Sequence, residues 1–169
     1  MSQAGHFFED FAPGQVIRHA LGRTVTDADN IWFTGITHNP NQAHFNADYA
    51  AHTPYGKMLV NSCFTLALVT GLTVADLSQN GFNLEWTHVR LPNPLFAGET
   101  VYAQSEVLAV RESRSRPQYG IITVRTYGYK HDGTVVIEFE RHIMVYKRAH
   151  APQGELVPAP NIPGQSEGS

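Results

Sequence analysis

The sequence predicts an α+β fold, with one antiparallel sheet of about five strands wrapped around a long central helix. A nearly uncharged run over residues 58–77 has apolar side chains on almost every side, which is typical of a helix enclosed by other structure. Four runs rich in β-branched and aromatic residues follow, and Asp132-Gly133 between the last two is a strong hairpin signal. One sheet packed on that helix satisfies this order of elements.

Length and composition fit one folded domain, predicted over residues 1–148. The chain has 169 residues, of which 42% are hydrophobic and 16% are charged, so it has enough apolar material for a core. Its formal net charge of −3 argues against nucleic acid as a partner. Residues 149–169 are rich in Pro, Gly, Ala and Ser, and we expect a disordered tail there.

The first half of the chain is predicted to begin with a strand over residues 15–25. Thr26 then has the character of an N-cap, and a helix with an apolar side should follow it to about residue 37. Asn46 could cap a short helix over residues 47–51, and the central helix should begin near Val60. The apolar residues of the first helix are Ile31, Trp32, Phe33 and Ile36.

The second half of the chain is predicted to hold four strands joined by turns. These strands cover residues 82–91, 100–111, 119–130 and 134–147. The outer face and the edges of such a sheet need cover, and a second copy of the chain could supply it. We therefore expect a homodimer, or a larger assembly built from it.

The cellular compartment and the metal content are predicted from sequence features that the chain lacks. Cys63 is the single cysteine, so no internal disulfide can form, and we interpret it as a small core residue. No group of Cys and His has zinc spacing, so no metal is expected. The N-terminus lacks the features of a signal peptide, and polar residues interrupt residues 58–77 too often for a membrane span. These features predict a cytoplasmic protein with no membrane partner.

The stretch Asn39-Pro-Asn-Gln-Ala-His44 places one imidazole and several side-chain amides on a short loop before the central helix. His44 could be an acid–base group, or it could be a structural histidine that caps the loop. Asn39 could hold a water molecule, or it could form a turn, as Asn next to Pro often does. The loop is therefore a candidate site with two interpretations for each residue.

Motifs across residues 7–147 resemble the MaoC-type dehydratases, a hotdog-fold family of enoyl-CoA hydratases and dehydratases. Leu59-Val60-Asn61-Ser62 and Arg111 to Pro117 are most similar to the branch of mesaconyl-CoA and β-methylmalyl-CoA hydratase-like proteins. The resemblance implies a hotdog fold, an acyl-CoA thioester as substrate, and no cofactor apart from the coenzyme A of that substrate. The other matching stretches are His38 to His44, Tyr49-Ala50-Ala51, Thr53-Pro54-Tyr55-Gly56 and Pro94 to Thr100.

The resemblance also implies roles for individual residues. His44 matches the catalytic histidine of the family, and Asn39 stands where the family has its catalytic aspartate. Ser62 stands where a helix-opening residue donates its backbone N–H to the thioester oxygen, and Thr70 matches a position that can hydrogen-bond the aspartate. The positions expected to bind substrate are Asn41, Gly56, Asn61 and Thr70.

The chemistry of hydration explains why these groups matter. Adding water to an α,β-unsaturated thioester needs a base for the water, a proton for the α-carbon, and donors such as free helix N–H groups for the enolate oxygen. An amide cannot take a proton at neutral pH, so His44 would be the sole base beside Asn39, unless Asp48 replaces the missing carboxylate. Two other functions stay open: a thioesterase that uses Asp48 or Glu85, and a non-catalytic acyl-CoA-binding or regulatory protein.

Three arginines, Arg111, Arg114 and Arg116, form a small basic cluster in a predicted hairpin loop. They could simply be solvated. Guanidinium groups also suit the phosphates of coenzyme A, so Arg114 and Arg116 are candidate substrate contacts.

Overall fold

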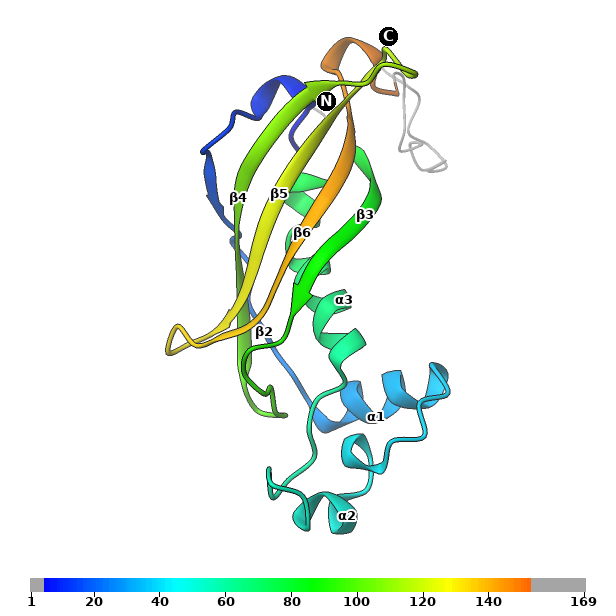
Figure 1. Ribbon diagram of the computed structural model, residues 1–169, viewed down its shortest axis with the longest axis vertical. Coiled ribbons are helices and arrows are strands. Elements are labelled where there is room, and N and C mark those ends of the chain that lie inside the picture. Colours follow the sequence, from blue (N-terminus) through cyan, green and yellow to red (C-terminus); the bar gives the residue numbers. More distant parts are fainter. Residues whose placement is uncertain (1–4, 153–169) are drawn as a thin grey trace, which may run out of the picture.

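The computed structural model describes residues 5–152, which form one curved sheet with helix α3 on one face and a lobe of helices beyond one end (Figure 1). The strands are β1 (Val16–Arg18), β2 (Arg23–Thr24), β3 (Gly81–Arg90), β4 (Thr100–Glu112), β5 (Tyr119–Lys130) and β6 (Val135–Tyr146). The α-helices are α1 (Asp27–Ile36), α2 (Ala47–Ala51), α3 (Ser62–Leu72) and α4 (Val74–Leu77). The 3-10 turns are η1 (Phe8–Asp10), η2 (Gln42–His44) and η3 (Arg148–His150).

The sheet has the order β1-β4-β5-β6-β3, with β2 also paired to β4, and every pairing is antiparallel. The predicted α+β architecture is therefore confirmed. Each of the four long strands begins and ends within one residue of its predicted bounds. The predicted hairpin turn is also present, with Gly133 at a φ of 85° and its N–H donated to the Lys130 carbonyl at 2.9 Å.

The first strand differs from its prediction, because residues 15–25 form two short strands rather than one. β1 pairs with Gln104–Glu106 of β4, and β2 pairs with Thr100 and Val101. Between them the backbone of Gly22 lies on the ring of Tyr102, so closely that a Cβ there would be 2.4 Å from a ring carbon. The chain has to rise over this ring, which interrupts the pairing.

The central helix is shorter and more open than predicted. It ends at Leu72, and Thr73 separates it from α4, with the Thr73 N–H and hydroxyl both donated to carbonyls of the last turn. Only Thr65, Val69 and Leu72 of α3 are buried, and Cys63 is exposed rather than a core residue. The helix is thus enclosed by the sheet on one side only. No helix within residues 5–152 is long and apolar enough to cross a membrane.

Helix α1 buries polar residues rather than its apolar side. Its N-cap is as expected, since the Thr26 hydroxyl accepts the Asp29 N–H at 3.2 Å. Its buried residues, however, are the polar pair Asn30 and Thr34, and Trp32 is 70% exposed. The helix turns its polar side inward because that side makes hydrogen bonds to the loops around it.

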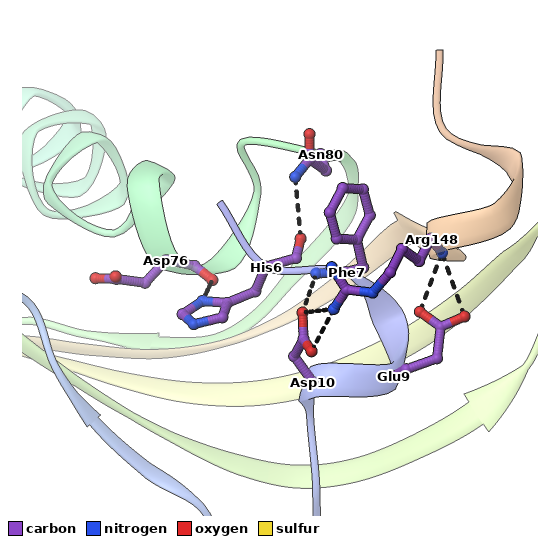
Figure 2. A network of polar contacts seen from close by, with 7 residues as sticks. All are labelled: His6, Phe7, Glu9, Asp10, Asp76, Asn80 and Arg148. Carbon is purple, nitrogen blue, oxygen red and sulfur yellow. Dashed lines mark hydrogen bonds and ion pairs between the residues drawn. The ribbon is translucent and has the colours of Figure 1, made fainter. Parts of the chain in front are cut away.

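The two described ends of the chain meet at the end of the sheet that lies away from α1 and α2 (Figure 1). Figure 2 shows the contacts there: the Arg148 guanidinium donates to both Asp10 carboxylate oxygens at 2.6 and 2.7 Å, and the Arg148 N–H points at the Glu9 carboxylate. His6 donates Nδ1–H to the Asp76 carbonyl at 2.8 Å. Of the predicted tail, residues 149–152 are described and begin in η3, whereas residues 153–169 lie outside the described residues.

Candidate active site

The loop that carries His44 lies in the lobe beyond the sheet, between α1 and α2 (Figure 1). His44 is 6% exposed, and its Nδ1 lies 2.8 Å from the Leu59 carbonyl oxygen. A carbonyl can only accept, so Nδ1 carries a proton, and in the neutral imidazole the lone pair is on Nε2. Among the described residues Nε2 has no hydrogen-bond partner, which leaves this nitrogen available for proton transfer.

Asn39 and Asn41 shape the turn that precedes His44. The Asn39 Oδ1 accepts the Asn41 N–H at 3.0 Å, the Asn41 Oδ1 accepts the Ala43 N–H at 3.1 Å, and the His44 N–H is donated to the Asn41 carbonyl. These are the local bonds that Asn makes in turns. Both amides therefore have a turn-forming role, and the Asn39 NH₂ group has no acceptor among residues 5–152.

Hydrogen bonds through Thr34 connect the N-terminus of α3 to this turn. Asn61 is the N-cap, with its side-chain oxygen accepting the Cys63 N–H at 2.9 Å. Ser62 is exposed, and its N–H donates to no acceptor within the described part of the chain. A cavity of about 210 Å³ opens beside this helix end, and its lining residues include Tyr55, Leu59, Ser62, Thr65 and Leu95. A thioester oxygen in this cavity could therefore meet a free helix N–H.

Two buried residues of α1, missed in the sequence analysis, connect these parts. The Asn30 side chain bonds the His44 and Leu59 carbonyls and the Asn61 N–H, and Thr34 accepts from the Asn61 amide at 3.2 Å. Their spacing of four residues puts them on one helix face, which was a usable signal. The neighbouring apolar residues masked it, because an apolar side normally faces the core.

The other predicted substrate-binding residues are placed as follows. Gly56 ends an exposed turn at a φ of 67°, and its N–H is donated to the Thr53 carbonyl. Asn61 has the capping role described above. The Thr70 hydroxyl is buried on α3 without a partner among residues 5–152, so it does not bond Asn39. Substrate contact by any of these residues stays a prediction.

The arginine cluster is not near His44 within one chain. Arg114 and Arg116 lie in the exposed turn between β4 and β5, at the end of the sheet opposite the lobe (Figure 1). The candidate carboxylates are also separate: Asp48 is exposed on α2, and Glu85 is exposed on β3, 3.8 Å from His142. Neither carboxylate lines the cavity beside α3.

A second buried histidine lies at the other end of α3. The His19 Nδ1 is 2.7 Å from the Asp76 carboxylate, and its Nε2 is 2.9 Å from the Ser105 hydroxyl, which in turn bonds Thr126. Burial lowers the pKa of His19 below its usual value, although Asp76 opposes this shift. Both ring nitrogens are used, so His19 has no free position for a ligand. No group of three potential metal ligands occurs within residues 5–152.

Known proteins are similar to this chain in sequence and in fold. Residues 1–157 match the family profile described as mesaconyl-CoA hydratase. A mesaconyl-CoA hydratase from Haloarcula marismortui is 34% identical over 151 residues, which is 88% of this chain and 42% of that protein. The chain therefore spans about half the length of the curated relatives it matches.

Solved structures support the same assignment. A MaoC-domain dehydratase from Chloroflexus aurantiacus superposes with a TM-score of 0.81 at 31% identity, over 94% of this chain and 45% of that one. A Mycobacterium tuberculosis protein with a double hotdog fold superposes with a TM-score of 0.76 at 22% identity, over 94% of this chain and 52% of that one, which shows the fold alone. The predicted hotdog fold is thus confirmed, and the chain belongs to the mesaconyl-CoA hydratase family.

Proposed function

We propose that this chain reversibly hydrates a short-chain enoyl-CoA, of which branched and dicarboxylic members such as mesaconyl-CoA are the first candidates. The observation that carries the proposal is the His44 imidazole, whose Nδ1–H is fixed on the Leu59 carbonyl while Nε2 has no partner within residues 5–152. Leu59, whose carbonyl holds this imidazole, lines the cavity at the N-terminus of α3, although His44 itself is not one of the lining residues. The family assignment supports the same chemistry.

In the proposed reaction His44 Nε2 takes a proton from water, and the water oxygen bonds to the β-carbon of the enoyl thioester. Negative charge develops on the thioester oxygen, where the Ser62 N–H and the α3 dipole would stabilise it. The α-carbon then takes a proton from the His44 imidazolium, which balances the addition of one water. The proposal needs no cofactor apart from the coenzyme A of the substrate.

Asn39 takes no proton in this scheme. Its Oδ1 is already bonded to the Asn41 N–H, so its NH₂ group is the part that could orient the attacking water or the thioester. A single histidine then acts as base and acid in turn. The arrangement also favours one alternative, a non-catalytic acyl-CoA-binding or regulatory protein, because the family carboxylate is missing.

The first test is the loss of enoyl-thioester absorbance with crotonyl-CoA and mesaconyl-CoA, and its gain with β-methylmalyl-CoA. We expect turnover by the wild type and a loss of about 100-fold or more in His44→Gln, since general acid–base groups contribute on that scale. His52→Gln, which removes an exposed imidazole, is the matched control and should keep wild-type turnover. The regulatory alternative would be favoured if the wild type binds acyl-CoA without turnover and Asn39→Asp alone restores activity. Release of free thiol would instead indicate a thioesterase.

We also propose that the active unit contains a second copy of the chain. Strand β3 is a sheet edge that exposes Phe82, Leu84, Trp86 and Val89, and α3 is open on one side. Antiparallel pairing of β3 with its copy about a two-fold axis would cover both surfaces. It would also bring the β4–β5 turn of one copy, with Arg114 and Arg116, toward the His44 end of the other, where coenzyme A phosphates could meet them.

Light scattering with size-exclusion chromatography tests the dimer. Trp86→Lys places a charge on the β3 edge and is expected to give monomers at micromolar concentration, with reduced activity. Val16→Lys on the opposite edge of the sheet, also exposed, is the matched control and should stay dimeric. A monomeric wild type, or a dimer in both variants, would contradict the proposed pairing.

A further inference from the structure

We infer that Asn30 is a positioning residue, which holds the His44 imidazole and the first turn of α3 in a fixed relative orientation. The inference deepens the proposed function and rests on it for its kinetic consequence. It also predicts which His44 nitrogen carries the proton, and this can be measured without any enzymatic turnover.

The Asn30 side chain is 1% exposed, and both of its N–H donors and its oxygen are bonded to backbone groups. Its Nδ2 donates to the His44 carbonyl at 2.8 Å and to the Leu59 carbonyl at 3.1 Å. Its Oδ1 accepts the Asn61 N–H at 2.8 Å. The orientation of the amide is fixed by chemistry, since two carbonyls require the nitrogen and an N–H requires the oxygen.

The Leu59 carbonyl is the group through which Asn30 acts on the imidazole. This oxygen accepts from Asn30 and from His44 Nδ1–H, so the first bond holds the acceptor that the second bond needs. Backbone bonds from the Leu59 N–H to Ala43 and from the Val60 N–H to Leu95 keep the segment in place from both sides. Loss of Asn30 would free the carbonyl to move, and the ring would lose its preference for the Nδ1–H tautomer.

Thr34, one turn after Asn30, extends the same network. Its hydroxyl accepts from the Asn61 side chain, and its carbonyl accepts the Asn39 N–H at 3.1 Å. The polar face of α1 therefore bonds the loop before His44, the His44 carbonyl, Leu59 and the cap of α3. This explains why α1 buries polar residues while Trp32 is exposed, since buried backbone groups need partners.

The test uses two variants that remove the donors in different ways. Asn30→Asp keeps an acceptor for the Asn61 N–H and loses the two N–H donors, whereas Asn30→Leu removes all three bonds without adding a carboxylate. We expect kcat to fall by on the order of 10- to 100-fold in both, with KM little changed, because a small misplacement of a reacting group has effects of that size. Thr126→Val, which removes a buried hydroxyl at the other end of α3, is the matched control for destabilisation and should keep kcat.

Imidazole ¹⁵N NMR gives a readout independent of activity, with the His44 signals assigned by their loss in His44→Gln. We expect the Nδ1–H tautomer in the wild type and in Thr126→Val, and a substantial Nε2–H population in both Asn30 variants. A tautomer and a kcat that stay as in the wild type would overturn the inference. Unfolding of both Asn30 variants would also overturn it, in favour of a purely structural role. A tautomer change in a protein that turns over no enoyl-CoA would support the positioning role and contradict the hydratase proposal.

Discussion

Helix α3 has a buried histidine network at each end, and the two networks differ in charge and in the use of the ring nitrogens. At the N-terminal end the His44 ring is bonded only through Nδ1, to the Leu59 carbonyl, and the Asn30 amide bonds the backbone carbonyl of His44. At the C-terminal end His19 bonds Asp76 through Nδ1 and Ser105 through Nε2, and the charged Arg141 is nearby. A histidine can exchange a proton with a ligand only if one nitrogen is free.

On the proposed function, the His44 end is the site of chemistry, and the His19 end holds parts of the fold together. Asp76 makes two contacts at this end. Its carboxylate bonds His19. Its carbonyl accepts from His6, as Figure 2 shows. That end therefore joins the first strand, the N-terminal segment and α4. The His44 end joins loops around a cavity instead. Variants at the C-terminal end should therefore change stability, and variants at the His44 end should change activity.

Arg141 gives the largest stability effect by which this comparison can be tested. It is fully buried, its Nη2 donates to the Thr73 hydroxyl at 2.7 Å, and its Nε and Nη1 have no partner among the described residues. Burial lowers its pKa to about 10. Arg141→Ala should destabilise the protein by about 3 kcal/mol in chemical denaturation, because it leaves a cavity and removes one of the two hydrogen bonds of the Thr73 hydroxyl.

The matched variant Arg141→Met keeps most of the side-chain volume and removes the unpaired cation. Replacing buried charge with apolar volume is often neutral, so we expect Arg141→Met to lie within about 1 kcal/mol of the wild type. Equal losses in both variants would show that the guanidinium itself stabilises the fold, through the carbonyl end of α3. If the C-terminal end of α3 affects stability and the His44 end affects activity, kcat should also stay unchanged in Arg141→Met.

The sequence allowed the fold to be predicted far better than the details of the site. Long strands and the Asp132-Gly133 turn have strong local signals, so β3 to β6 were placed almost to the residue. The loop with His44 could be identified from its motif. The inward polar face of α1 could not, because the partners of Asn30 are backbone groups 14 to 31 residues away. The open side of α3 was missed for a similar reason. Apolar residues on every side predict that a helix is buried, but they do not show whether its own chain or a second copy covers it.

The pH dependence of stability provides the smaller and finer test of the comparison. His19 has a lowered pKa in the folded protein, so the unfolded chain binds more protons as the pH falls below the ordinary histidine value of about 6.5. Stability from His19 is therefore complete above about pH 6.5 and is lost as the pH falls toward the folded pKa, with a slope of at most about 1.4 kcal/mol per pH unit.

Urea denaturation between pH 7.5 and pH 5 measures this slope. His19→Gln should be less stable at pH 7.5 and should lose much of the slope, because its side chain does not titrate. His52→Gln, on the exposed surface, controls for loss of a histidine and should keep the wild-type slope. Asp76 and Arg141 are the charged groups that face His19, and a slope that persists in His19→Gln would have to come from a group other than His19. That result would contradict the assignment of His19 as the titrating group of the structural network.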